Sequence, residues 1–289
     1  MNMRVLLGML CLLLGLIRAA SAQEVLDVSL HEEIVQLPVA ALATGEEPRQ
    51  IVATLFRPDG AGPFPLLVLS HGNPPSAADR PRIGRYRQIV QIREFVQRGY
   101  AVIVPIRRGY GASGGDYAES YARCSSNEFF RAGMEAARDV LAALAYARTL
   151  PWVRTEGTVL AGQSAGGFAS IAAASLQPAG VVAVLNFSGG RGGDPVKHPA
   201  VPCGEGAMAA TFARFGASTR VPVLFHYVEN DQFFGPDYTR SWFEAFEQAG
   251  GRGRFVLQPA YGKDGHGLFA SKGATQIWSR EVDAFLAAL

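Results

Sequence analysis

The stretch Thr158-Val159-Leu160-Ala161-Gly162-Gln163-Ser164-Ala165-Gly166-Gly167 joins a short apolar run to a glycine-rich turn and then to alanine-rich sequence. The G-x-S-x-G spacing between a strand and a helix is typical of a nucleophile elbow, in which a strained serine exposes its hydroxyl above a helix N-terminus. Gly162 and Gly166 suit so tight a turn because a Cβ at either position would meet neighbouring backbone. The stretch therefore predicts Ser164 as a nucleophile.

A second G-x-S-x-G match occurs at Gly111-Ala112-Ser113-Gly114-Gly115, also after an apolar run. It continues into Asp116-Tyr117-Ala118-Glu119, which has no small-residue helix face. Ser164, in contrast, is followed by the helical sequence 168–174, rich in alanine. Because an elbow needs a strand before it and a helix after it, Ser113 is interpreted as a loop residue.

Short continuous apolar runs, typical of strands covered on both faces, alternate with helical patterns along most of the chain. The runs are 66–70, 101–104, 158–161, 181–185, 223–227 and 255–257, and the helical patterns cover 84–98, 237–248, 273–289 and a segment opened by a capping box, Ser125-x-x-Glu128. Val28–Val39 and Gln50–Arg57 precede them as two antiparallel strands around a polar turn at 44–48. The pattern predicts a doubly wound, mostly parallel α/β sheet with antiparallel N-terminal strands.

The first 22 residues have the features of a signal peptide. Arg4 lies before an apolar core from Val5 to Ile17, and Ala20-Ser21-Ala22 forms an A-x-A cleavage site. The core is too short to span a bilayer, which takes roughly 20 residues. We therefore expect an exported protein, periplasmic or secreted, without a stable membrane anchor.

Residues 23–289 are expected to form a single domain, with an irregular Gly/Pro-rich excursion at about 188–204. Removal of Arg4 and Arg18 with the signal peptide balances 25 basic against 25 acidic residues. A neutral chain of this kind gives no indication of nucleic-acid binding. The remaining cysteines, Cys124 and Cys203, would form a disulfide in an oxidising compartment, with two free thiols as the alternative.

A serine hydroxyl needs a base, and the base needs an acid that fixes its tautomer. His266, between Gly265 and Gly267, follows an apolar run, and Asp231 follows the run ending at Val228, which gives the chain order Ser, Asp, His. Other acids that could take the place of Asp231 are Asp237, Asp194 and Glu229. His226 lies inside an apolar run and is interpreted as a satisfied core residue, and Asp264 is too near His266 in sequence to orient it easily.

The oxyanion of an acyl-transfer intermediate requires two N–H donors. The backbone N–H of Ala165, directly after the nucleophile, is one candidate. The other is Asn73 in the loop Ser70-His71-Gly72-Asn73-Pro74-Pro75, because the two prolines have no N–H. No cofactor and no metal site is indicated.

Several motifs together resemble α/β-hydrolases of the dienelactone hydrolase-like and carboxylesterase group, over nearly all of residues 23–289. They are Phe56-Arg57-Pro58, Phe64-Pro65 followed by Leu66 to Gly72, the segment from Arg107 to Gly114, the elbow, and Gly265-His266-Gly267. True dienelactone hydrolases carry cysteine at the nucleophile, where this chain has Ser164. The resemblance therefore implies a serine hydrolase but does not assign a lactone substrate.

The resulting expectation is an exported serine hydrolase that cleaves small carboxylic esters through an acyl-enzyme. A serine aminopeptidase or acyl-peptide hydrolase is the alternative enzyme, and a catalytically silent binding protein is the alternative of another class. Acyl and alcohol specificity and the oligomeric state are not determined by the sequence. Arginines near the oxyanion loop could border the cleft and favour carboxylate-bearing esters; alternatively, most of them face solvent or pair with acids on helix surfaces. They are Arg80, Arg82, Arg85, Arg87, Arg107 and Arg108.

Overall fold

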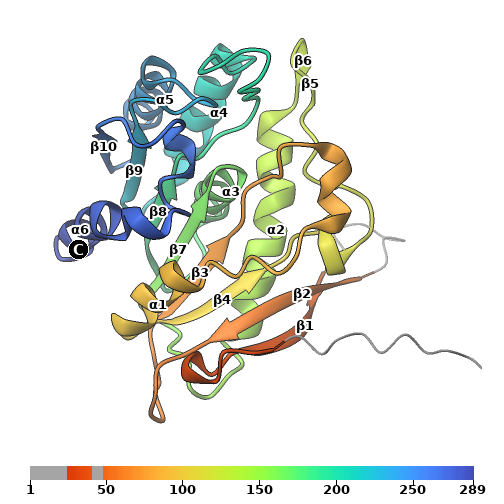
Figure 1. The fold of residues 1–289 in the computed structure, drawn as a ribbon, viewed down its shortest axis with the longest axis vertical. Coiled ribbons are helices and arrows are strands. Elements are labelled where there is room, and N and C mark those ends of the chain that lie inside the picture. The colour runs from red at the N-terminus through yellow and green to blue at the C-terminus, as the bar shows by residue number, and fades with distance from the viewer. Residues whose placement is uncertain (1–24, 41–47) are drawn as a thin grey trace, which may run out of the picture.

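The computed structural model describes residues 25–40 and 48–289, so the expected signal peptide and nearly all of the expected turn at 44–48 lie outside the described residues. Within these ranges an eight-stranded sheet has the order β1-β2-β4-β3-β7-β8-β9-β10 (Figure 1). Its strands are β1 (Glu33–Val39), β2 (Arg49–Phe56), β3 (Leu66–Ser70), β4 (Ala101–Pro105), β7 (Thr158–Gln163), β8 (Val181–Phe187), β9 (Val223–Val228) and β10 (Gly253–Gln258).

The pairing confirms the predicted fold class. β1 pairs antiparallel with β2, and β2 pairs antiparallel with β4. All the remaining neighbours in this sheet are parallel. The strands β3, β4, β7 and β9 are buried along their whole length, which accounts for their continuous apolar sequences.

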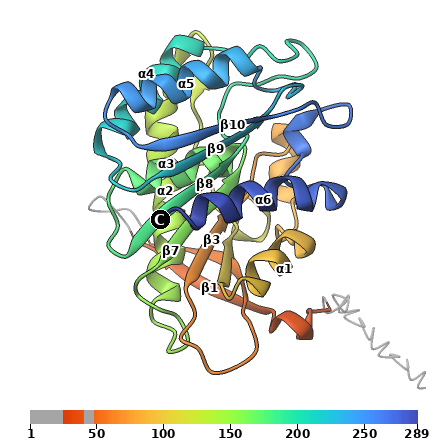
Figure 2. The same ribbon diagram turned by 90° about the vertical axis from the view of Figure 1, so that its left-hand side faces the viewer.

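Helices cover both faces of the sheet (Figure 2). The larger apolar core packs one face against α2 (Phe129–Ala147), α3 (Ala165–Ala174), α4 (Glu205–Ser218) and α5 (Pro236–Gln248). The other face packs against α1 (Ile89–Gln97) and α6 (Thr275–Leu286). Because the crossovers place β3 and β7 side by side at the centre, the loops after these two strands meet above the middle of the sheet.

Three local expectations were wrong. Val28–Leu30 forms a 3₁₀ turn rather than strand, because the Asp27 side chain accepts the N–H of Ser29 and closes the turn. Ser125 does not open a helix: it lies in the hairpin of β5 (Ala122–Arg123) and β6 (Ser126–Asn127), and α2 begins only at Phe129. The first crossover helix is also shorter than expected, since α1 begins at Ile89 and the 3₁₀ helix Ala77–Arg82 precedes it.

The segment 188–204 contains no helix or strand, apart from an isolated bridge between Asp194 and His198. It leads into α4, a helix that the sequence analysis did not identify. None of the helices in the described ranges combines the length and the apolar character needed to cross a membrane.

His226 is a buried residue of β9, as expected, but it is not satisfied. Its Nε2 has no hydrogen-bond partner among the described residues, and its ring packs against Phe187 at 5.6 Å between centroids. Burial lowers the pKa of this imidazole from 6.5 to about 4. The ring is therefore neutral in the folded protein at neutral pH and is an unfavourable group to protonate.

This burial generates a prediction for the pH dependence of stability. The unfolded chain takes up a proton at His226 below its ordinary pKa, while the folded chain resists until about pH 4, so stability falls as pH decreases across that interval. His226→Leu should remove this loss. Between pH 6.5 and about pH 4, its free energy of unfolding should therefore rise relative to that of the wild type by on the order of 3 kcal/mol. Urea unfolding at a series of pH values measures it. His198→Leu, at an exposed histidine, is the control, and a His226→Leu profile parallel to the wild type would contradict the prediction.

Candidate active site

Ser164 lies in the turn between β7 and α3 with φ 55° and ψ −125°. A positive φ is costly for a residue with a Cβ, by about 1–3 kcal/mol, and persists only where the surroundings impose it. Here the Ser164 N–H donates to the carbonyl of Phe187 at 2.9 Å, and the Ser164 carbonyl accepts the N–H of Phe168 at 3.1 Å. The neighbouring strand and the following helix thus hold the serine in its strained conformation.

Close backbone contacts surround the elbow. A Cβ on Gly162 would lie 2.3 Å from the carbonyl carbon of Gly166, and a Cβ on Gly166 would lie 2.0 Å from the carbonyl oxygen of Ser70. A Cβ on Gly72 would lie 3.1 Å from the Cβ of Ser164. The end of β3 and the loop after it therefore pack directly against the serine turn.

Asp231 and His266, 35 residues apart, meet through their side chains. The Nδ1 of His266 lies 3.0 Å from Oδ1 and 2.9 Å from Oδ2 of Asp231. Oδ1 of Asp231 also accepts the backbone N–H groups of Phe233 and Phe234, at 2.8 and 2.9 Å. A carboxylate on Nδ1 favours the tautomer with the proton on that nitrogen, which leaves Nε2 as an acceptor.

His266 is also positioned by groups that could not be assigned this role from the sequence. Oδ1 of Asp264 accepts the backbone N–H of His266 at 2.9 Å and that of Gln232 at 3.0 Å, which ties the two loops together. Gln163 donates from Nε2 to the His266 carbonyl at 3.0 Å and accepts the Tyr86 hydroxyl at 2.7 Å. Asp264 acts on the backbone of the histidine rather than on its ring. In the sequence, this role was indicated only by the position of an Asp two residues before His266, a spacing typical of side chains that cap a turn.

Ser164 and His266 line the same cavity of about 410 Å³, together with Gly72 and Asn73. In the described ranges the Ser164 hydroxyl forms no hydrogen bond, including to His266. Hydrogen bonds between a nucleophile and its base are frequently long without substrate. Phe233 also lines this cavity and stacks on the His266 ring at 4.1 Å between centroids.

The competing candidates lie in different surroundings. The Ser113 hydroxyl donates to the carbonyl of Ile106 and accepts the N–H of Val52, so it bridges two strands. The carboxylate of Asp194 accepts backbone N–H groups within its own loop, while Asp237 and Glu229 are exposed. The structure thus brings Asp231, and none of the three alternative acids, to the His266 ring.

Two backbone N–H groups beside Ser164 have no acceptor in the described part of the chain: those of Ala165 and Asn73. The Asn73 side chain is itself fixed, because its Oδ1 accepts the Tyr110 hydroxyl and its Nδ2 donates to the Tyr117 hydroxyl at 3.3 Å. These two donors are available for an anionic oxygen. Within the described residues no group of His, Cys, Asp or Glu side chains is arranged to hold a metal ion.

His71 supports this loop from below. Its Nδ1 contacts the Gly72 carbonyl at 2.8 Å, and its Nε2 accepts the backbone N–H of Arg107 at 3.1 Å. Burial, reinforced by the charge of Arg107, lowers the pKa of His71 to about 3. A neutral imidazole can accept at one nitrogen and donate at the other, which is the pattern observed.

The arginines singled out in the sequence are distributed differently. Arg107 is fully buried and pairs with Glu119, and Arg108 pairs with Asp139 and Glu135 away from the cavities. Arg82 pairs with Asp79 at the surface. Arg85 and Arg87 border the cavity next to His266, but both bind Glu32. Arg80 is the one member of this set that lines the larger cavity described next.

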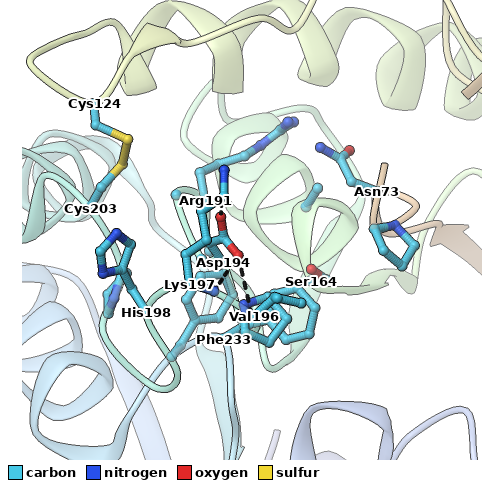
Figure 3. A pocket seen from close by; sticks show the side chains of 18 of the residues that line it. Asn73, Cys124, Ser164, Arg191, Asp194, Val196, Lys197, His198, Cys203 and Phe233 are labelled. Carbon is cyan, nitrogen blue, oxygen red and sulfur yellow. Dashed lines mark hydrogen bonds and ion pairs between the residues drawn. A yellow bond between two sulfur atoms is a disulfide. The ribbon is translucent and has the colours of Figure 1, made fainter. Parts of the chain in front are cut away.

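Ser164 also lines a second cavity, of about 690 Å³ (Figure 3). Asn73 and Ser164 lie at one end of the view, and the disulfide between Cys124 and Cys203 lies at the other. The disulfide joins the β5–β6 hairpin to the segment 188–204. That segment supplies much of the wall, including Arg191, and Ser164, Asn73 and Phe233 line both cavities.

Known proteins share a family and a fold with this chain. Residues 48–215, more than half of the chain, match the family described as X-Pro dipeptidyl-peptidase (S15 family). Among curated protein sequences no significant relative matches.

Solved structures show the same fold at low identity. An acylaminoacyl peptidase from Pyrococcus horikoshii has a TM-score of 0.65 and 15% identity over 90% of this chain, which spans 41% of that longer protein. An esterase from Pyrococcus furiosus has a TM-score of 0.61 and 14% identity, with 90% of this chain and 91% of the esterase covered. A protein assigned as a dienelactone hydrolase from Klebsiella pneumoniae has a TM-score of 0.55 and 15% identity, with 87% and 97% covered. The resemblance to α/β-hydrolases is thereby confirmed.

The contacts at the elbow predict a sharp difference between two glycines. Gly166→Ala forces a Cβ onto the backbone of β3 and should lower the free energy of unfolding by about 3 kcal/mol or more. Gly206→Ala in α4 meets nothing within 4 Å and should raise it by up to about 1 kcal/mol, because alanine favours helix. Urea unfolding of both variants measures this. Equal effects of the two substitutions would contradict the packing described.

Proposed function

Because this chain belongs to the X-Pro dipeptidyl-peptidase (S15) family, a family of α/β-hydrolases, we propose that it is a serine hydrolase that cleaves carboxylic esters through an acyl-enzyme. Ser164 is the nucleophile, His266 the general base and Asp231 the acid that orients it. The observation that carries the proposal is the His266–Asp231 hydrogen bond beside a cavity that Ser164 lines from a strained elbow.

In the proposed mechanism the Ser164 Oγ attacks the ester carbonyl carbon while His266 Nε2 takes the hydroxyl proton. The carbonyl oxygen becomes an oxyanion, which the N–H groups of Ala165 and Asn73 stabilise. When the tetrahedral intermediate collapses, the bond to the alcohol breaks and His266 returns the proton to the leaving oxygen. A water, activated by the same histidine, then hydrolyses the acyl-enzyme and restores the Ser164 hydroxyl.

Asp231 stabilises the imidazolium that forms in each half-reaction. It is completely buried, so its charge acts on His266 with little screening by water. The two backbone N–H donors from Phe233 and Phe234 keep the carboxylate in place before the reaction begins. Asp231 is thus already placed to stabilise the imidazolium.

Peptide hydrolysis is the second candidate, because the S15 description and the acylaminoacyl peptidase fold both point to it. An aminopeptidase must bind the ammonium group of its substrate, which requires acidic side chains in the site. Among the described residues, Asp194 is the single acid that lines the two cavities, and its carboxylate already faces Lys197 at 3.9 Å and two backbone N–H groups. Esters are therefore favoured over peptides with a free N-terminus.

We further propose that the protein works outside the cytoplasm, in the periplasm or as a secreted enzyme, as a single domain after removal of residues 1–22. Residues 1–22 contain a basic residue, an apolar core and an A-x-A site in the order typical of a cleavable signal peptide. The Cys124–Cys203 disulfide is consistent with an oxidising compartment.

Replacement of the nucleophile or the base tests the mechanism. Ser164→Ala and His266→Ala should each lower kcat for p-nitrophenyl butyrate by on the order of 10³-fold or more without unfolding the protein, because the two act as a unit. Labelling by a fluorophosphonate should occur in the wild type and disappear in Ser164→Ala. A wild type that is neither labelled nor active would instead indicate a silent scaffold, and activity retained in either variant would refute the assignment.

The orienting acid can be tested against a matched exposed aspartate. Asp231→Asn should lower kcat by on the order of 10³- to 10⁴-fold, because the amide no longer holds His266 in the productive tautomer. Asp237→Asn, in the first turn of α5, should stay within about twofold of the wild type. A larger loss in Asp237→Asn than in Asp231→Asn would show that the acid is misplaced.

The disulfide should affect both stability and substrate size. The double variant Cys124→Ser/Cys203→Ser frees a loop closed over 79 residues and should lose up to about 4 kcal/mol. Because both cysteines line the larger cavity, KM should change more for p-nitrophenyl octanoate than for the acetate. Thermal melts measure the effect on stability, and KM values for a series of ester chain lengths measure the effect on substrate size. If KM depends on chain length in the same way in the variant and the wild type, the disulfide does not influence substrate entry.

A further inference from the structure

The larger cavity beside Ser164 carries an excess of basic groups. Its lining, as far as the described residues supply it, contains Arg80, Arg191, Lys197 and His198 but a single acid, Asp194. That acid is occupied, because its carboxylate accepts the N–H groups of residues 196 and 197 and pairs with the exposed Lys197 ammonium. The basic groups deeper in the cavity therefore have no acidic counterpart on its wall.

The excess continues into the protein below the cavity floor. Arg107 and Arg191 both bind one carboxylate, that of Glu119, and all three side chains are at most 2% exposed. Although burial alone would raise the pKa of the Glu119 carboxyl, the charges of Arg107 and Arg191 lower it to about 2. His71, in contact with Arg107, stays neutral. The cluster thus holds one positive charge more than negative.

Part of the donor capacity of this cluster is unused. Nε of Arg191 and Nη2 of Arg107 are buried and have no hydrogen-bond partner among the described residues. A buried charged donor without a partner is costly, so such groups normally meet an acceptor. Of the two arginines, Arg191 is the one that lines the cavity, but its side chain is only 1% exposed and is held by Glu119 and Tyr117, so it contributes its charge to the cavity rather than a free donor.

Tyr117 connects this cluster to a third arginine, Arg80, and to the oxyanion loop. Its hydroxyl accepts from Nη1 of Arg191 at 2.9 Å and from Nδ2 of Asn73 at 3.3 Å. The guanidinium of Arg80 lies over its ring, 3.7 Å from the centroid. In the described part of the chain Arg80 forms no ion pair and is half-buried, so its charge is partly shielded from water yet unpaired.

We propose that Arg80, with the charge of the buried Arg191 beside it, forms a subsite for a carboxylate carried by the substrate, so that the preferred substrates are esters bearing a second, free carboxylate. The inference rests on the proposed esterase function and specifies its substrate class. Guanidinium groups bind carboxylates through charge-assisted, frequently paired hydrogen bonds. An anion in the cavity would balance the excess charge of the buried cluster, whereas an ammonium group there would be repelled.

The test compares two esters of equal acyl length, p-nitrophenyl hydrogen glutarate and p-nitrophenyl pentanoate. The wild type should favour the glutarate in kcat/KM by about tenfold or more at low salt, and less at about 0.5 M NaCl, because exposed parts of the subsite are screened. Arg80→Gln should lower the glutarate-to-pentanoate ratio by about tenfold. Arg80→Lys, which keeps the charge but not the fork, should retain part of the ratio.

Arg82→Gln is the matched control, since it removes an equal charge from the same 3₁₀ helix at an exposed residue paired with Asp79. Its ratio should equal that of the wild type. Absence of a preference for the glutarate in the wild type, or a ratio that Arg80→Gln leaves unaltered, would overturn the subsite.

Calorimetry separates this proposal from the proposed function. If neither ester is hydrolysed, separate titrations of the protein with monomethyl glutarate and with methyl pentanoate still test the subsite. Binding of the anion alone, lost in Arg80→Gln, would uphold the carboxylate subsite and refute the esterase. Equal or absent binding of both compounds would refute the subsite as well.

Discussion

Backbone-to-backbone contact at the elbow is the constraint on which the rest of the site depends. Gly166 lies so close to the end of β3 that no side chain fits between them, and Gly162 is equally close to Gly166. This contact holds the positive φ of Ser164 and sets the loop after β3 beside it. The N–H groups of Ala165 and Asn73 are brought together for the same reason. The strain at one residue is thus sustained by the packing of two adjacent parallel strands.

The acid and the histidine are held by a separate device, a pair of loops joined at their backbones. Asp264 accepts N–H groups from both loops. Gln163, the residue just before the nucleophile, donates to the carbonyl of His266 and so joins the histidine loop to the elbow. The three candidate catalytic residues therefore share one hydrogen-bonded framework, although they are far apart in sequence. In such an arrangement, small shifts of either loop would change the distance between base and nucleophile.

The charge distribution distinguishes this chain within the broad set of hydrolases that share its fold. Fold similarity at 14–15% identity does not choose between an esterase and a peptidase. The lining of the cavities does bear on that choice, because Asp194, the one acid among the described lining residues, is engaged, while Arg80 forms no ion pair in the described part of the chain. The buried cluster of Arg107, Glu119 and Arg191 gives this bias a physical basis, since its excess charge cannot be screened by water.

The sequence by itself determined the fold class, the elbow and the chain order of Ser164, Asp231 and His266, because apolar periodicity and glycine spacing are local properties of a chain. It did not reveal α4. It also misread Ser125 as a helix cap, because the segment pairs as a hairpin that the bond from Cys124 to Cys203 ties to a distant part of the chain. Which arginines reach the cavity, and the excess charge beneath it, were decided only by the tertiary structure. Arg80 and Arg82 are nearly adjacent in sequence, yet one lies on Tyr117 in the cavity wall and the other pairs with Asp79 in solvent, a difference that depends on what the fold places opposite each side chain.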